Sequence, residues 1–264
     1  MSQASDKHLA ARQLFDRTAD QYQQRSGTRI YDLTSFAFAR RKAIVLEFLD
    51  SSPRSGSVLD YGMGPGVFAP DVVSRGLRFI GIDLSPEMIE LARSLGLENC
   101  EYVAGDLDAL SAYREAVDVV LAIGLIDYLD EPEAGLEKLV TTLKPGGTLI
   151  LSFRNRRSLV TLLRDFSKRV WRGFFGKSGR RSDTAFASPV HEKSFSFRSE
   201  LQPTLSRLNM SDFEVRYFRF SPIFVNVPIP KPLWLFWYPI DKALAGRWTR
   251  WLCSGGVLSC RKRA

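Results

Sequence analysis

The ten residues SVLDYGMGPG, from Ser57 to Gly66, decide the fold. The first five are mainly apolar and include one acid, Asp60, which predicts a short buried strand. The three glycines that follow at every second position predict a tight turn. Without Cβ atoms on that turn, a ligand can approach the backbone and the amides at the start of the next helix. On this stretch alone, a turn that binds nothing remains the simpler explanation.

Similar apolar runs recur along the chain and alternate with helical patterns. The run ending at Asp83 is followed by Ser85-Pro-Glu, which predicts a helix with Ser85 as its N-cap. Strands that alternate with helices predict an α/β fold with a mostly parallel sheet and helices on both faces. We expect seven strands, at 57–61, 78–83, 101–104, 116–123, 148–153, 213–220 and 256–260, and further helices at 7–24, 33–50, 67–74, 133–143, 157–175 and 198–208.

Length and composition favour one globular domain. The chain has 264 residues, of which 45% are hydrophobic and 25% charged, and it contains no low-complexity linker. Its polar start lacks the apolar region of a signal peptide, and no run of about 18 apolar residues occurs, so we expect a cytoplasmic protein that does not span a membrane. Three cysteines without CxxC spacing predict neither a disulfide framework nor a metal site.

The positive charge is concentrated in one segment. The net charge is +8, and residues 156–181 contain nine Lys or Arg and a single acid. The rest of the chain is nearly neutral, which argues against a general nucleic-acid-binding protein.

Two features favour an adenosyl ligand over a dinucleotide. Val67 occupies the position where the GxGxxG fingerprint needs its third glycine, so NAD or FAD binding is disfavoured. Asp83 lies 23 residues after Asp60, at the end of the second expected strand. A carboxylate at that place can accept hydrogen bonds from both ribose hydroxyls.

The motifs VLDYGMGPG, GIDLSPEMIELAR, VAGDLDAL, DVVLAIGLIDYLDEPE and LKPGGTLILSF resemble those of class I S-adenosylmethionine (SAM)-dependent methyltransferases. The resemblance extends from Ser57 to Phe153 and is greatest to the small-molecule enzymes of ubiquinone and menaquinone biosynthesis. It implies a Rossmann-like class I methyltransferase fold, with the last of seven strands antiparallel. It also implies SAM as cofactor and S-adenosylhomocysteine (SAH) as product.

The resemblance also implies a set of cofactor-binding residues. The methionine end of SAM is assigned to Asp60, Gly62 and Gly64, the ribose and adenine to Asp83 and Leu84, the adenine also to Asp106 and Leu107, and the floor of the site to Ala122, Ile123 and Gly124. Tyr61, Gly66 and Met88 are expected to line the same site. Tyr22 corresponds to a tyrosine that covers the cofactor, although packing explains it equally well.

Candidate catalytic residues follow the fourth strand or lie further along the chain. Relatives often carry a histidine in 125–129, where this chain has Asp127 and Tyr128. Asp127 either steers or deprotonates an amine or caps the helix expected near Glu131, and the cap is slightly favoured. His191 lies in a segment that resembles the acceptor side of the family, so it is a candidate base, although a structural role is more common for a lone histidine.

Two further segments point to a hydrophobic acceptor. The helix expected at 157–175 has an apolar face and a basic face, and 221–252 is rich in Trp and Pro. Both compositions suit contact with an anionic membrane surface. A surface helix and a lid or dimer surface are the alternatives. We therefore expect a lipid, quinone or lipid-linked sugar as acceptor, with the protein placed peripherally at the inner face of the membrane.

A single methyltransferase domain over 1–264 is expected, in four parts: an N-terminal helical cap (1–52), the SAM-binding core (53–155), a basic amphipathic helix or lid (156–195) and the C-terminal strands (196–264) with the insert at 221–252. The alternative functions are methylation of a soluble metabolite or of nucleic acid, and a non-catalytic binding scaffold. Nucleic acid is disfavoured because Ala122-Ile-Gly-Leu replaces an Asn/Asp-Pro-Pro-aromatic motif. The intact glycine loop and Asp83 disfavour a scaffold. The oligomeric state is left open.

Overall fold

A computed structural model describes residues 33–52, 55–159, 162, 193–220 and 250–264. The expected helix at 7–24, most of the basic helix at 157–175 and nearly all of the Trp-rich insert lie outside the described residues. In the part of the chain that is described, no helix is both long enough and apolar enough to cross a membrane.

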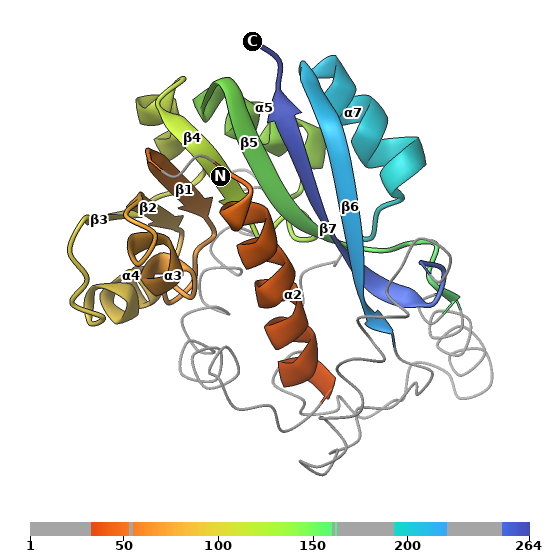
Figure 1. Ribbon diagram of the computed structural model, residues 1–264, viewed down its shortest axis with the longest axis horizontal. Helices are drawn as coiled ribbons and strands as arrows, with labels where there is room; N and C mark the ends of the chain where they lie inside the picture. Colours follow the sequence, from red (N-terminus) through yellow and green to blue (C-terminus); the bar gives the residue numbers. More distant parts are fainter. Residues whose placement is uncertain (1–32, 53–54, 160–161, 163–192, 221–249) are drawn as a thin grey trace, which may run out of the picture.

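A seven-stranded sheet forms the centre of the molecule, as the sequence predicts (Figure 1). Its strand order is β3-β2-β1-β4-β5-β7-β6. The first five are parallel, and β7 is antiparallel to both of its neighbours, which confirms the expected orientation of the last strand. The strands are β1 (Ser57–Tyr61), β2 (Arg78–Asp83), β3 (Cys100–Ala104), β4 (Val117–Ala122), β5 (Leu143–Arg154), β6 (Met210–Phe220) and β7 (Cys253–Lys262).

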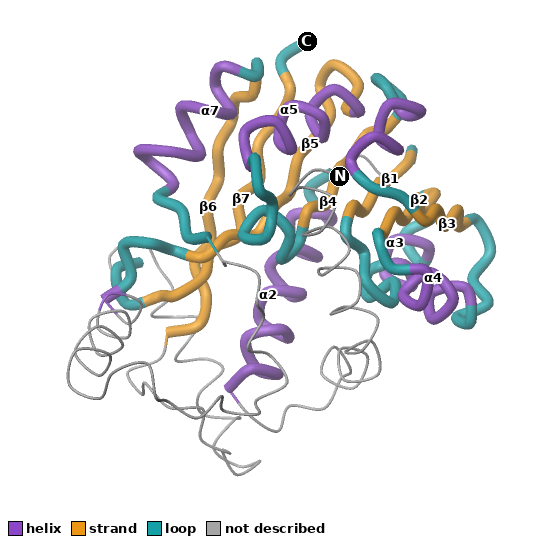
Figure 2. Tube along the Cα trace, turned by 180° about the vertical axis from the view of Figure 1, so that it is seen from behind, coloured by secondary structure: helices purple, strands orange, loops and turns teal. Residues whose placement is uncertain are grey.

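Helices cover both faces of the sheet (Figure 2). One core packs under α2 (Leu33–Asp50), α3 (Ala69–Val73) and α4 (Pro86–Arg93). A second core lies on the opposite face, under the 3-10 helix η1 (Leu107–Tyr113), α5 (Pro132–Thr142), the π-helical turn η2 (Phe197–Leu201) and α7 (Gln202–Arg207). Burial on both faces explains why the central strands read as continuous apolar runs.

The start of β5 differs from the sequence-based expectation. The sequence predicts that the strand begins at Thr148, because Lys144-Pro-Gly-Gly147 is typical of the end of a helix such as that expected at 133–143, yet the strand begins at Leu143. The pairing with β4 shifts register here, since Val117 pairs with Leu143 but Val119 pairs with Thr148. The residues of β5 between these two pairs form a bulge. The two glycines, which suit the end of a helix, therefore lie inside an interrupted strand.

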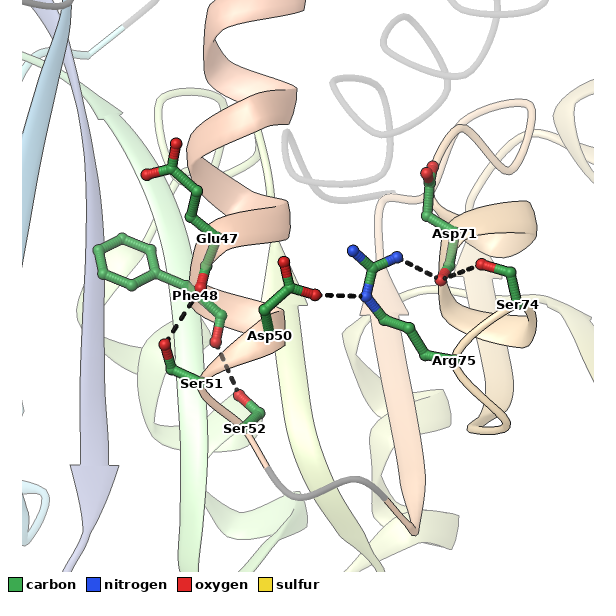
Figure 3. Close-up of polar contacts among 8 residues, drawn as sticks. All are labelled: Glu47, Phe48, Asp50, Ser51, Ser52, Asp71, Ser74 and Arg75. Carbon is green, nitrogen blue, oxygen red and sulfur yellow. Dashed lines mark hydrogen bonds and ion pairs between the residues drawn. The ribbon is translucent and has the colours of Figure 1, made fainter.

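The C-terminal end of α2 is fixed to α3 by polar contacts (Figure 3). The hydroxyls of Ser51 and Ser52 donate to helix carbonyls one turn back, at 3.2 and 3.0 Å. Arg75 then donates to the Asp50 carboxylate at 2.8 Å and to the Asp71 carbonyl at 2.7 Å. This attachment holds α2 beside the helix that follows the glycine turn.

Candidate cofactor and acceptor site

The carboxyl ends of β1, β2 and β4 lie side by side, because these strands are parallel neighbours. In open α/β sheets, ligands bind outside this edge, where the strand order reverses. Here the order reverses between β1 and β4. The glycine turn, Asp83 and the 122–128 loop all follow these strand ends, so the fold brings most of the predicted residues to one edge.

The glycine turn has the conformation that its sequence predicts. Gly62, Gly64 and Gly66 have φ values of +74°, +57° and +75°, in the left-handed region. A Cβ atom at Gly62 would lie 3.1 Å from Leu125 Cδ1, so a side chain here would also require Leu125 to shift. The turn therefore requires glycine and exposes bare backbone to a ligand.

Asp83 links the end of β2 to the glycine turn. Its Oδ2 accepts a hydrogen bond from the Gly64 amide at 2.8 Å, and its Oδ1 accepts one from the Ser85 amide at 3.0 Å. Ser85 in turn caps α4 by accepting from the Met88 amide at 3.3 Å, as predicted. Both oxygens of the Asp83 carboxylate thus lie beside backbone amides, at the strand end where the sequence predicts a ribose-binding acid.

Asp60 is buried behind the glycine turn, with 1% of its surface exposed. Burial raises the pKa of Asp60 to about 8, the charge of Asp83 adds to this rise, and Arg41 opposes it. Within the described part of the chain, its Oδ2 has no hydrogen-bond partner. An unpaired buried oxygen is costly. It fits a ligand that supplies a cationic donor, as the ammonium group of SAM would.

The remaining predicted cofactor residues occupy this edge in different ways. Tyr61, Met88, Ala122 and Ile123 are buried, whereas Leu84, Leu107 and Gly124 are half-buried. Burial raises the pKa of Tyr61, and the charge of Asp106 adds to the rise, which places these two predicted residues near each other. Asp106 is exposed and caps η1 by accepting from the Asp108 amide at 2.9 Å.

The favoured prediction for Asp127, a cap of α5, is wrong. The N-cap of α5 is Glu131, which makes no side-chain capping bond. Asp127 instead turns toward the end of β5, where its Oδ1 accepts from the Arg154 amide at 3.1 Å. Its side chain is buried, and burial raises the pKa of Asp127 to about 6. The hydrogen bond from the Arg154 amide and the charges of Arg154 and Arg41 oppose this rise. The carboxyl group is thus part of the site wall.

Arg41 of α2 is a site residue that the sequence analysis missed. Its charge acts on both Asp60 and Asp127, and its Nη1 lies 2.9 Å from the place of a Cβ atom at Gly124. The available signal was the basic triplet that begins at Arg40, inside an otherwise apolar helix. Arg41 therefore places one positive charge between two buried carboxyl groups.

The other candidate catalytic residues are not all placed. Tyr128 is half-buried and follows Asp127 on the same loop, where its amide donates to the Leu125 carbonyl at 2.9 Å. Tyr22 and His191 lie outside the described residues. In the described ranges, no group of His, Cys, Asp and Glu could hold a metal ion.

Comparison with known proteins agrees with this geometry. Residues 59–151 match the sequence model of a family described as "Methyltransferase domain". The matched segment runs from β1 into β5 and contains the glycine turn, Asp83 and Asp127, so the resemblance to class I methyltransferases is confirmed.

Proteins similar in sequence include the ubiquinone biosynthesis O-methyltransferase of Xanthomonas axonopodis pv. citri, which is 31% identical over 117 residues. That match covers 42% of this chain and 49% of the relative, so the chain spans about half the length of this curated relative.

Solved structures show the same fold over almost the whole chain. Magnesium protoporphyrin IX methyltransferase from Synechocystis PCC 6803, with bound SAH, has a TM-score of 0.63 at 16% identity and covers 97% of this chain and 99% of its own. A possible histamine N-methyltransferase from Thermotoga maritima has a TM-score of 0.58 at 19% identity, and the match covers 95% of this chain and 99% of that protein. At such identities the likeness establishes the class I methyltransferase fold.

Proposed function

We propose that the protein is a SAM-dependent methyltransferase whose acceptor is a hydrophobic or membrane-associated small molecule. The observation that carries the activity is the contact between Asp83 and Gly64, which joins a ribose-binding acid to a Cβ-free turn. The unpaired Oδ2 of Asp60 beneath that turn supports an ammonium-bearing ligand. The match to the methyltransferase domain family supports the same activity.

The residues of the site have distinct tasks in this proposal. Asp83 and the glycine turn hold the nucleoside, and Asp60 faces the amino-acid end. Bound SAM supplies an activated methyl group, so the protein needs chiefly to orient the acceptor and exclude water. Orientation of this kind can lower a barrier by about 7–11 kcal/mol. The Gly124 amide donates to Ser152 Oγ at 2.7 Å and so fixes the loop on the acceptor side.

Asp127 is the residue in this loop with the properties of a proton acceptor. Its carboxyl group is buried beside the strand ends, and its pKa of about 6 is close to the pH at which a general base works well. Oδ1 is occupied by the Arg154 amide, which leaves Oδ2 as the atom for an acceptor proton. An acceptor oxygen or nitrogen that loses its proton to Oδ2 becomes the stronger nucleophile.

The hydrophobic acceptor is supported by composition and by one relative. The basic segment 156–181 and the Trp-rich segment 221–252 suit a membrane surface, and the Xanthomonas relative is named for ubiquinone biosynthesis. We propose a lipid, quinone or lipid-linked sugar, methylated at an oxygen, nitrogen or carbon atom.

The test is transfer of labelled methyl from SAM into a cell extract that is then separated into lipid, aqueous and nucleic-acid fractions. We expect label in the lipid fraction with the unaltered protein and none with Asp83→Ala. Asp118→Ala is a matched control, because Asp118 also bonds a backbone amide, that of Ser57, but at the amino edge of the sheet. Label confined to the aqueous or nucleic-acid fraction would overturn the acceptor class, and absence of label from every fraction would overturn the activity.

A further inference from the structure

Asn155 ties the end of β5 to the start of β7. Its Nδ2 donates to the carbonyl oxygens of Arg250 and Cys253 at 2.8 and 2.9 Å, and the residue is only 4% exposed. Four residues further on, the Leu159 amide donates to the Trp251 carbonyl at 2.6 Å. The described end of the basic segment, at Leu159, and the described end of the Trp-rich segment, at Trp251, therefore lie side by side.

Large apolar side chains are exposed at this junction. Leu159, Leu162 and Trp251 are 39%, 55% and 49% exposed. Among the residues that the structure describes, one other large hydrophobic side chain, Leu95, is exposed to this degree. Exposed apolar residues that gather in one place mark an interaction surface, whereas single ones need no explanation.

Three arginines lie at the same junction. The backbones of Arg157 and Arg250 both bond to Asn155. Burial raises the pKa of Tyr217 on β6, and the charges of Arg250, Arg198 and Arg157 counteract this rise, so all three charges lie in the neighbourhood of this side chain. In the described part of the chain, none of the three forms an ion pair, whereas Arg156 pairs with Glu200 at 2.7 Å. Within the described residues, the junction thus combines exposed apolar side chains with three arginines that form no ion pair.

This surface adjoins the acceptor side of the proposed active site. The Arg154 amide donates to Asp127 Oδ1, and Arg154 is the residue before Asn155. The Arg157 amide donates in turn to Asn155 Oδ1 at 3.2 Å. Two hydrogen bonds from backbone amides to side-chain oxygens therefore connect the junction to the loop that would meet an acceptor.

We propose that Leu159, Leu162 and Trp251, together with Arg157, Arg198 and Arg250, form a docking surface for an anionic phospholipid bilayer. This inference, here called the lipid-docking surface, rests on the proposed function and places the membrane beside the acceptor loop. Arginines attract lipid phosphates, and neighbouring apolar side chains insert below the headgroups. A second copy of the chain fits less well, because a two-fold interface would bring like charges together.

The experiment is co-sedimentation of the full chain with vesicles of phosphatidylcholine, with and without phosphatidylglycerol. We expect binding that requires the anionic lipid and weakens with salt. Leu162→Ser should weaken it by about tenfold, since burial of a leucine contributes about that factor. Arg157→Ser combined with Arg198→Ser should weaken it by about tenfold or more. The matched controls Leu95→Ser and Arg114→Ser replace exposed residues elsewhere and should bind like the unaltered protein.

Three results would overturn the lipid-docking surface: no sedimentation with anionic vesicles, equal losses in the control variants, or a solution dimer that Leu162→Ser dissociates. SAM binding, measured by calorimetry without lipid, separates this inference from the proposed function. Vesicle binding without SAM binding would leave the surface intact and refute the methyltransferase activity. SAM binding together with unchanged vesicle binding in the variants would refute the lipid-docking surface and leave the proposed function intact.

Discussion

The Oδ2 atom of Asp83 lies 2.8 Å from the backbone nitrogen of Gly64 and accepts its hydrogen bond. The bond connects the end of β2 to the turn after β1, two places that are 19 residues apart in sequence. The carboxylate proposed to hold the ribose therefore also shapes the turn beside it, before any ligand binds. Loss of this carboxylate should affect both the turn and the ligand.

Asp83→Asn should weaken SAM binding by about 10- to 100-fold. Hydrogen bonds to a charged group contribute about 1.5–3 kcal/mol, and the asparagine amide turns a donor toward one of two backbone N–H groups. Isothermal titration calorimetry measures the effect. Asp118→Asn disturbs a comparable bond to Ser57 and should lower stability while SAM affinity is retained. Equal SAM affinity in Asp83→Asn and the unaltered protein would refute the assignment.

Gly62→Ala and Gly76→Ala should lower the unfolding free energy by different amounts, although the two glycines have similar φ values. Their φ values are +74° and +76°, so alanine costs each about 1–2 kcal/mol of unfolding free energy. Gly76 has no atom within 4 Å of an added Cβ, whereas at Gly62 that atom would meet Leu125 at 3.1 Å. Urea denaturation should show the larger loss for Gly62→Ala, and SAM binding should fall in that variant alone. Similar losses would mean that Leu125 moves aside easily.

The central sheet could be predicted from sequence because both of its faces are buried. Strands such as 57–61 and 78–83 are short apolar runs bounded by glycines or acids, and the structure has them at these residues. The bulge at the start of β5 could not be predicted, since a KPGG segment suits a helix stop as well as an interrupted strand. The choice depends on pairing with β4, a contact between distant residues.

In the candidate site, local backbone conformation could be predicted from sequence, whereas contacts between distant residues could not. The left-handed turn at Gly62 and the end of a strand at Asp83 could be predicted, because turns and strand ends are encoded by residues close in sequence. The partner of Asp127 could not, because the Arg154 amide is 27 residues away and any loop acid before a helix resembles a cap. Arg41 was missed for the same reason, since its role depends on how α2 packs across the glycine turn.

The stability of the protein should fall as pH rises from about 4 to about 8, in part because of Asp60. In this window the folded state keeps the Asp60 proton, since burial raises the pKa to about 8, while the unfolded chain has released it. The slope from Asp60 is up to about 1.4 kcal/mol of unfolding free energy per pH unit, and it vanishes below about pH 4, where both states hold the proton. Urea denaturation of Asp60→Asn across the window should show a shallower slope. Identical slopes would place the proton elsewhere.

SAM binding at pH 7 should release a proton from Asp60. A cation near Oδ2 favours the ionised carboxylate and so lowers the raised pKa. Calorimetry in buffers of different ionisation enthalpy detects the released proton as a buffer-dependent heat. The heat should become independent of buffer in Asp60→Asn, which has no proton to release. A buffer-independent heat in the unaltered protein would show that the ammonium group binds elsewhere.

Asp127 allows its structural and its chemical role to be separated. Asp127→Asn keeps an oxygen that can accept from the Arg154 amide but removes the negative charge, whereas Asp127→Ala removes both. If the carboxylate takes the acceptor proton, Asp127→Asn should lower kcat by about 10²–10⁴-fold at unchanged stability. The unaltered enzyme should then lose activity as pH falls through about 6, the pKa of Asp127, because the protonated acid cannot act as a base.

The pH profile decides between these roles more sharply than the loss of rate. In Asp127→Asn, the fall in kcat/KM near pH 6 should disappear, because the group that titrates there is gone. A merely structural Asp127 predicts the opposite pattern: Asp127→Asn would be nearly as active as the unaltered enzyme, with the same pH profile, and Asp127→Ala alone would be inactive and less stable. The two variants share one site and differ in one hydrogen-bond acceptor, so this comparison isolates the charge of the carboxylate from its bond to β5.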